Sequence, residues 1–290
     1  MAFIIAIAGK GGVGKTTISA MLVRYLLKID KPVLAVDADP NSNLNAALGL
    51  EYEETIADIR EKVKKQTPES FSKSEFFGLK LEEAIVEGSG FDLLVMGRPE
   101  GPGCYCAINN ILREYLEKIS KKYKFVVIDN EAGMEHLSRR TAADIDLLLL
   151  VSDPTMVGIN SAINAFNTAK SAGIKIKDIR LVINKSKNEL ESDRLRLIEK
   201  AGLKIGAYIT FQDEIEKNSE KGSSVKTEIA SSSALGGLLA MTSVMSLRSA
   251  SPKAGGEAIS FLDHFNTDNT VMDILFLGRK RLGERILRRS

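Results

Sequence analysis

The chain has 290 residues, of which 44% are hydrophobic, so it is long enough to bury the core of one large domain. Charged residues make up 27% and nearly balance, leaving a formal net charge of +2 without the one-signed field typical of nucleic-acid-binding proteins. No apolar run reaches the length of a membrane span, and residues 1–8 lack the basic region and cleavage site of a signal peptide. We therefore expect no nucleic-acid partner and no membrane-spanning segment.

Short apolar runs of β-branched character alternate with segments of helical period along most of the chain. The expected strands are residues 3–8, 33–36, 91–96, 125–128, 147–151, 181–183 and 205–209. The expected helices are residues 16–28, 111–122, 158–171 and 190–201. This alternation predicts an α/β fold, a doubly wound and mostly parallel sheet with helices on both faces. Residues 52–90 are polar and interrupted, and we expect helices and loops without chemistry there.

The composition changes near the C-terminus, where Ser and Gly become frequent after Ser231 and residues 251–256 read as a linker. We expect a nucleotide-binding domain over residues 1–245 and a separate extension over residues 246–290. The tail at residues 276–289 mixes apolar residues with six cations. Such a tail suits an anionic membrane surface, and equally a solvated or partner-docked segment, so membrane binding is the less favoured interpretation.

The first expected strand runs directly into a glycine-rich loop, residues 9–17, which read GKGGVGKTT. Gly9, Gly14, Lys15 and Thr16 have the spacing of a phosphate-binding loop at the start of a helix. Its backbone N–H groups should cradle an anion, through Gly11, Gly12, Val13 and Gly14. Lys15 should lie along the β and γ phosphates, Thr16 should bind Mg²⁺ and Thr17 should face the α phosphate. ATP and Mg²⁺ are the expected ligands, and a chance glycine-rich turn is disfavoured because strand and helix flank the loop.

Lys10, inside the loop, marks the deviant form of this motif. Here the sequence resembles the MinD/ParA/nitrogenase-iron-protein family of P-loop ATPases, which includes septum-positioning and plasmid-partitioning proteins. The resemblance implies that Lys10 reaches the nucleotide of a partner subunit and acts in catalysis with Lys15, and therefore that the protein is a homodimer. The alternative is that Lys10 is an ordinary exposed lysine.

Two carboxylates follow the second expected strand, Asp37 and Asp39. By resemblance, Asp39 is the catalytic aspartate of switch I, which orients the attacking water. Asp37 is expected to assist Mg²⁺ indirectly, although aspartates at a strand end also serve as turn or helix-capping residues. Four apolar residues precede Asp129, the arrangement of a Walker B aspartate, and Gly133 would then lie in switch II.

Asn184 ends a further expected strand, and an asparagine amide can pair with the N6 and N7 edge of adenine. Asn184 resembles the base-reading residue of the family. The second wall of the base pocket in the family comes from an Ile-Pro turn, whereas this chain has Ile209 followed by Thr210. The preference for ATP over GTP therefore rests on the resemblance.

The chain's two cysteines, Cys104 and Cys106, are too close in sequence for an unstrained disulfide and are expected to be free thiols in the cytoplasm. Thiolates are soft ligands that suit Zn²⁺, Ni²⁺ or iron–sulfur clusters, but one Cys-x-Cys supplies only two ligands of the four that closed sites need. A two-fold dimer would bring four thiolates together on its axis. The alternative is that the two cysteines merely pack as small apolar side chains.

The loop, the Cys-x-Cys pair and residues 130–139, which read NEAGMEHLSR, together resemble the CooC-type nickel-insertion ATPases of carbon monoxide dehydrogenase. The resemblance covers about residues 3–245 and implies an ATP-hydrolysing homodimeric metallochaperone that binds nickel or zinc through Cys104 and Cys106. Its expected client is carbon monoxide dehydrogenase or a related nickel enzyme. Two alternatives stay open: an iron–sulfur electron-transfer ATPase, and a membrane-associated positioning ATPase of the MinD/ParA type.

Overall fold

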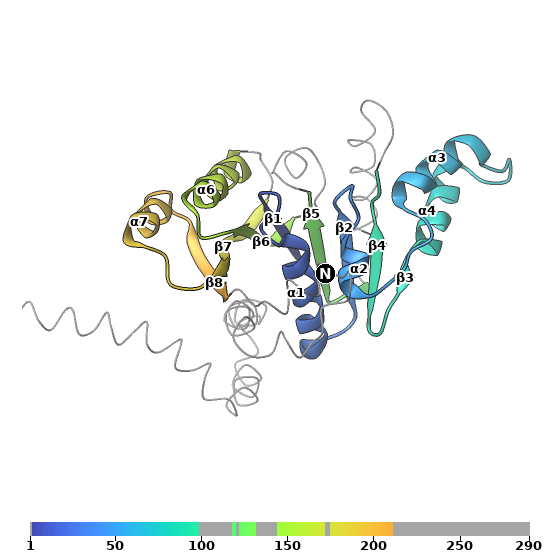
Figure 1. The fold of residues 1–290 in the computed structure, drawn as a ribbon. Coiled ribbons are helices and arrows are strands. Elements are labelled where there is room, and N and C mark those ends of the chain that lie inside the picture. The colour runs from blue at the N-terminus through green and yellow to red at the C-terminus, as the bar shows by residue number, and fades with distance from the viewer. Residues whose placement is uncertain (1, 99–117, 120–121, 132–143, 172–174, 211–290) are drawn as a thin grey trace, which may run out of the picture. The chain divides into compact units, whose positions relative to one another are not determined.

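The computed structural model describes residues 2–98, 118–119, 122–131, 144–171 and 175–210. Its centre is an eight-stranded sheet with the order β3-β4-β2-β5-β1-β6-β7-β8 (Figure 1). Neighbouring strands pair in parallel, except for β3, which pairs antiparallel with β4 at one edge. The strands are β1 (Phe3–Gly9), β2 (Val33–Ala38), β3 (Val86–Glu87), β4 (Phe91–Val95), β5 (Phe125–Asn130), β6 (Ile145–Ser152), β7 (Ile176–Ser186) and β8 (Lys204–Thr210). The expected mostly parallel α/β sheet is confirmed.

Helices cover both faces of the sheet. They are α1 (Lys15–Ile29), α2 (Leu44–Leu48), α3 (Ile56–Gln66), α4 (Lys73–Glu83), α6 (Met156–Ser171) and α7 (Ser192–Lys200). Alternate residues of a strand point to opposite faces, and Ile4, Ala6 and Ala8 of β1 join one core cluster with buried residues of α3 and α6. Helix α1 lies over β5, β1 and β2, but its buried side chains are outside that cluster. It therefore packs on the other face, in front of the sheet in Figure 1.

Apart from β4, which ends one residue earlier than expected, the predicted strands are longer than the apolar runs that indicated them, and β7 shows why. Only residues 181–183 of this strand form a continuous apolar run, yet it extends from Ile176 to Ser186. Asp178 and Arg180 lie within the strand and form an ion pair with each other at 2.9 Å. The ladder of backbone hydrogen bonds does not need apolar side chains, so a charged pair at a half-exposed position is tolerated. The expected helix over residues 111–122 lies almost entirely outside the described residues.

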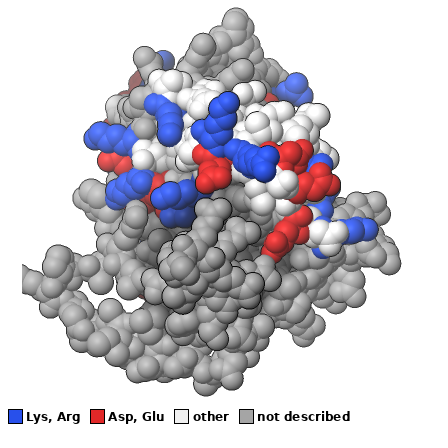
Figure 2. Space-filling view, turned by 90° about the vertical axis from the view of Figure 1, so that its left-hand side faces the viewer, with Lys and Arg blue, Asp and Glu red and all other residues white. Residues whose placement is uncertain are grey.

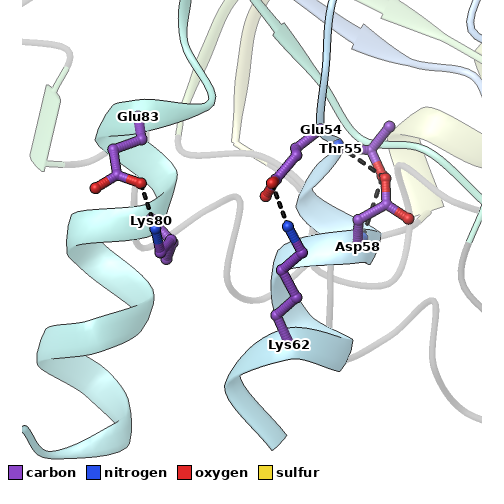
Figure 3. Close-up of polar contacts among 6 residues, drawn as sticks. All are labelled: Glu54, Thr55, Asp58, Lys62, Lys80 and Glu83. Carbon is purple, nitrogen blue, oxygen red and sulfur yellow. Dashed lines mark hydrogen bonds and ion pairs between the residues drawn. The ribbon is translucent and has the colours of Figure 1, made fainter. Parts of the chain in front are cut away.

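Residues 52–90 form a helical hairpin of α3 and α4, followed by the short strand β3. Helices were expected in this segment, but the strand was not. Each helix starts with a capping box: Thr55 with Asp58, and Ser72 with Glu75. Figure 3 shows the first of these boxes together with two exposed ion pairs of the hairpin, Lys62 with Glu54 and Lys80 with Glu83. Such local signals allow the hairpin to form beside the sheet.

The hairpin is attached to the carboxyl end of β4. The amide of Ala57 donates to the carbonyl of Met96 at 3.0 Å, and a Cβ on Gly97 would lie 2.3 Å from the Thr55 hydroxyl oxygen. Gly97 also has a φ of 72°, so glycine is required there for both steric and conformational reasons. The hairpin base is thus packed tightly against the end of β4.

The α7 end of the sheet carries charges of both signs. In Figure 2, which faces this end, Lys and Arg side chains lie among Asp and Glu side chains. At the start of α7, Arg194 forms an ion pair with Glu191, and Lys177 of β7 forms one with Asp146 of β6. This face therefore does not present a field of a single sign, in keeping with the small net charge.

The chain divides into two units, Met1–Ser231 and Ser232–Ser290, and all described residues belong to the first. The expected boundary between residues 245 and 246 lies outside the described residues and stays a prediction. Among the described helices, none combines the length and the apolar character needed to cross a membrane.

Candidate functional site

The glycine-rich loop lies between the end of β1 and the start of α1. Gly9, Gly12 and Gly14 have φ values of 153°, 78° and 91°, which side chains other than glycine rarely adopt. A Cβ on Gly9 would also lie 2.3 Å from the carbonyl oxygen of Val151 on the neighbouring strand β6. No side chain caps the N-terminus of α1, so its first N–H groups are available to an anion at the positive end of the helix dipole. This is the predicted phosphate-binding loop.

The two lysines of the loop lie in different environments. Lys15 is 7% exposed, and its Nζ lies 3.4 Å from the carbonyl oxygen of Lys10, so its charge is held beneath the loop. The Lys10 side chain is exposed, as are Gly11 and Gly12. Lys15 is thus placed for phosphates bound in the loop, and the Lys10 side chain is open to solvent.

Asp129 is the central buried carboxylate of the site. It is 1% exposed, and its Oδ1 accepts a hydrogen bond from the hydroxyl of Ser19 on α1 at 3.0 Å. Burial raises the pKa of Asp129 to about 6, while the nearby hydroxyls of Thr16 and Ser19 and the charge of Lys15 lower it. Its Oδ2 is buried without a hydrogen bond of normal geometry. A buried carboxylate oxygen beside the Thr16 hydroxyl fits Mg²⁺, which prefers hard oxygen ligands.

Thr16 and Asp129 are therefore the residues that would hold Mg²⁺ with a bound nucleotide. The ion would neutralise charge that builds up on the phosphates during transfer. The protein itself supplies the buried carboxylate, the Lys15 ammonium group and the row of loop amides. Thr17, on the first turn of α1, is half-buried beside Thr16.

Asp37 is fully buried and acts as a backbone acceptor. Its Oδ1 accepts from the amide of Asp39 at 3.1 Å, and its Oδ2 accepts from the amide of Leu44, the first residue of α2, at 2.8 Å. Asp37 pairs in register with Asp129 on the adjacent strand. Burial, and to a lesser degree the charge of Asp129, raise the pKa of Asp37 to about 7. The geometry supports the turn-and-cap interpretation, since both oxygens hold the segment that contains Asp39.

Asp39 lies just beyond the end of β2 and is half-exposed. Its Oδ1 accepts from the backbone and side-chain amides of Asn41, at 2.9 and 3.0 Å. Within the described part of the chain, both bonds go to Oδ1 and none goes to Oδ2, so Oδ2 can accept a hydrogen bond from a water molecule. The predicted catalytic aspartate is thus accessible on the same edge of the sheet as the phosphate loop.

The neighbours of Asp129 and the end of β7 complete the described site. The side-chain Nδ2 of Asn130 donates to the carbonyl of Ile7 on β1 at 2.9 Å. This bond fixes the position of the last residue of β5. Asn184 is 9% exposed, and its Nδ2 donates to the carbonyl of Val13 in the phosphate loop at 2.7 Å. The predicted base-reading residue is therefore next to the loop. The structure brings the predicted nucleotide-site residues together, except for Gly133, which lies outside the described residues. The predicted nickel or zinc ligands Cys104 and Cys106 also lie outside them and stay a prediction.

Sequence reasoning missed two supporting residues, Ser19 and Arg24, and it placed Asn130 in switch II without predicting its contact with Ile7. A polar residue on the buried face of α1, four positions after Lys15, was a signal that could have identified Ser19. Arg24, also on α1, donates to the carbonyl groups of Ala47 and Leu48 at the end of α2, at 3.1 and 3.4 Å. Nothing in the spacing of the sequence indicates that contact, because α1 and α2 meet only in the folded chain.

Comparisons with known proteins agree with this site. Residues 4–225 match the CobQ/CobB/MinD/ParA nucleotide binding domain family. An uncharacterized ATP-binding protein of Methanocaldococcus jannaschii is 43% identical over 224 residues, which are 76% of this chain and 88% of that protein. The carbon monoxide dehydrogenase accessory protein CooC of Rhodospirillum rubrum is 36% identical over 185 residues, which are 59% of this chain and 70% of CooC.

Among solved structures, the septum site-determining protein MinD of Pyrococcus horikoshii, complexed with Mg-ADP, has a TM-score of 0.64 at 22% identity. The match covers 89% of this chain and 99% of that one, and it shows a common fold. The family match extends over the phosphate loop, both buried aspartates and Asn184. The chain belongs to the CobQ/CobB/MinD/ParA nucleotide-binding domain family and is an ATP-binding P-loop ATPase.

Proposed function

We propose that this ATPase is a homodimeric metallochaperone of the cytoplasm, which binds Ni²⁺ or Zn²⁺ through Cys104 and Cys106 and assists nickel insertion into carbon monoxide dehydrogenase or a related nickel enzyme. The observation that carries the proposal is the 36% identity to a carbon monoxide dehydrogenase accessory protein, combined with a Cys-x-Cys pair in this chain. The metal ion is the cargo in this proposal, and ATP binding and hydrolysis drive the change between the open and the closed dimer.

The exposed parts of the nucleotide site support a dimer. Lys10 lies in solvent at the rim of the phosphate loop, where a second subunit's nucleotide is within its reach once two sites face each other. Val157, near the start of α6, is 64% exposed, and α6 begins at the same edge of the sheet as the loop. A cation and an exposed apolar side chain on one edge are suited to a subunit contact that closes over ATP.

The strand that carries switch I is linked to the segment that leads to the cysteines. The amide of Met96, just after β4, donates to the carbonyl of Asp37 near the end of β2 at 2.8 Å. This hydrogen bond ties the carboxyl ends of the two strands together. Cys104 follows Gly97 by only seven positions. A rearrangement of Asp37 and Asp39 on ATP binding or hydrolysis would thus be transmitted through Met96 and Gly97 toward the cysteine segment.

Ligand number supports metal binding by two subunits. One chain offers two thiols, and a tetrahedral soft-metal site takes four ligands, so a two-fold dimer completes the set. If ATP and metal both favour the closed dimer, each must tighten the binding of the other by the same factor.

The experiment is an anaerobic titration of Ni²⁺ and Zn²⁺ into the wild-type protein and a Cys104→Ser, Cys106→Ser double variant. Each titration is done with ATP, with ADP and without nucleotide, and the mass of the assembly is recorded. The proposal predicts one tightly bound metal per dimer, tighter with ATP and lost in the double variant. The double variant itself serves as the control for metal binding elsewhere.

Three outcomes would contradict the proposal. Metal binding that is unchanged in the Cys104→Ser, Cys106→Ser double variant would favour a positioning ATPase. A brown anaerobic preparation with visible absorption would favour an iron–sulfur electron-transfer ATPase. Equal metal affinity with and without nucleotide would remove the coupling on which a chaperone cycle depends.

A further inference from the structure

We propose that Asn184 is a positioning residue for the phosphate loop: its side-chain amide holds the Val13 carbonyl and so shapes the loop for phosphate, whichever base the nucleotide carries. The resemblance to the family predicts only a base-reading role for this residue. Asn184 then also takes part in binding the triphosphate itself.

The end of β7 is built to present Asn184 to the loop. The pairing of β7 with β8 shifts register twice, between Leu181 and Val182 and again between Ile183 and Ser186. Lys185 has a φ of 57°, in the left-handed region that residues other than glycine rarely occupy. Asn184 therefore lies where the strand departs from regular pairing, next to a residue whose backbone conformation is unfavourable by itself. Backbone strain of this kind persists only where surrounding contacts enforce it.

The contact between Asn184 and the loop is close and buried. Its Nδ2 donates to the Val13 carbonyl at 2.7 Å, and both residues are buried, with Asn184 9% and Val13 2% exposed. A Cβ added to Gly14 would lie 2.5 Å from the same Nδ2 atom. The amide thus fills the space behind the loop, and it requires glycine at position 14 in addition to the φ of 91°.

Peptide geometry links this contact to the phosphate side of the loop. The Val13–Gly14 peptide is planar and trans, so its C=O and N–H groups point in opposite directions. With the Val13 carbonyl held toward Asn184, the Gly14 N–H is directed away from it and is free for a phosphate oxygen. Without the amide, a buried carbonyl would have no partner, and rotation of the peptide would turn an oxygen toward the anion.

Base reading and loop positioning do not compete for the same atoms. An asparagine amide has two N–H donors and one oxygen acceptor, and the contact with Val13 uses one N–H. The other two groups remain for a base. The two roles are therefore separable by ligands that lack a base.

The test compares the wild-type protein with Asn184→Ala, Asn184→Asp and the exposed control Asn188→Ala. Asn184→Asp has almost the same shape but no hydrogen to donate to Val13. Dissociation constants are measured by calorimetry with Mg²⁺ for ATP, GTP and inorganic tripolyphosphate, and steady-state hydrolysis of ATP is measured in parallel. Thermal melting without ligand shows whether each variant is folded.

If Asn184 positions the loop, Asn184→Ala and Asn184→Asp weaken the binding of tripolyphosphate by a factor of about ten, since a buried acceptor is left unpaired. The same variants weaken ATP and GTP by at least this factor, because a contact with the base is lost in addition to the loop contact. In these variants KM for ATP rises, kcat at saturating ATP changes little, and Asn188→Ala matches the wild type. The inference is overturned if tripolyphosphate binds the variants as tightly as the wild type while only the preference for ATP over GTP is lost.

A measurement on the wild-type protein covers the case in which the variants do not fold. The side-chain amide hydrogens of Asn184, followed by NMR in the nucleotide-free protein, are expected to exchange slowly, because one is buried in a hydrogen bond. They are also expected to stay protected when tripolyphosphate binds. Rapid exchange in the nucleotide-free protein would overturn the inference.

Discussion

Replacing Asp129 by asparagine tests whether the nucleotide site is built at the expense of stability. Burial raises the pKa of this carboxyl from 3.8 to about 6, so its ionised form is disfavoured in the folded protein. A rise of about two pKa units corresponds to about 3 kcal/mol of stability lost on ionisation. The added Nδ2 of asparagine lacks an acceptor at this position, which costs about 1–2 kcal/mol. Asp129→Asn is therefore expected to be more stable than the wild type by about 1–2 kcal/mol at pH 8 without Mg²⁺.

The sign of the pH dependence follows from the direction of the shift. Because the folded-state pKa of Asp129 lies above its unfolded-state value, the wild type keeps its stability below about pH 4 and loses it as the pH rises through about 6. The advantage of Asp129→Asn should therefore shrink between pH 8 and pH 5. The pKa of Asp37 is also raised, to about 7, so ionisation of Asp37 destabilises both proteins as the pH rises. This loss of stability is smaller in the variant, because the charge of Asp129 is absent.

The assay is urea unfolding at pH 8 and pH 5 with a chelator present, and then with Mg²⁺ and ATP. Asp193→Asn, an exposed change on α7, is the control. With Mg²⁺ and ATP the order should reverse, because the wild type gains a ligand that the variant holds poorly. A wild-type protein as stable as Asp129→Asn at pH 8 without Mg²⁺ would refute the reasoning.

Three further predictions concern other parts of the molecule. Asp39→Asn is expected to lower kcat for ATP hydrolysis by roughly 100-fold or more while nucleotide affinity stays within a few-fold, measured by phosphate release and calorimetry; a parallel loss of affinity would contradict a catalytic role. Gly97→Ala should destabilise the fold by about 1–3 kcal/mol in urea unfolding, because the added Cβ would clash with Thr55. The control Gly78→Ala, in open space within α4, should be neutral or stabilising by up to about 1 kcal/mol. Equal effects of the two substitutions would refute the steric argument. Arg24→Met should raise KM for ATP a few-fold with little change in kcat, because the last carbonyl groups of α2, which follows switch I, lose their hydrogen-bond donor. An unchanged KM would show that nucleotide binding does not depend on the contact between Arg24 and α2.

The strand runs and the phosphate loop were predictable because each rests on a local pattern. The buried centre of a parallel strand is a continuous apolar run, and a phosphate loop needs glycines at fixed offsets before a helix, so both are visible over fewer than ten residues. Asp39 and Asp129 were predictable for the same reason, since each closely follows an apolar run: Asp39 lies just beyond β2, and Asp129 is the last residue but one of β5. Both strands end at the ligand-binding edge.

The hydrogen-bond partners of Asp37 and Asn184 were not predictable from local patterns. The sequence placed Asp37 beside Asp39 but did not show that its two oxygens would hold the amides of Asp39 and Leu44. It likewise placed Asn184 at a strand end without indicating its contact with Val13, which is 171 positions away in the chain. Position in a strand follows from sequence spacing, whereas a hydrogen-bond partner depends on which strands become neighbours.

The sequence by itself therefore determined the class of fold, the phosphate loop and the edge at which the ligand binds, because apolar periodicity and glycine spacing act within single elements. Only the tertiary structure decided which groups meet at that edge. The order of strands in the sheet brings Asp37 beside Asp129 and the end of β7 beside the loop. That order is set by packing of the whole core, in which every strand and helix buries its apolar face against the others.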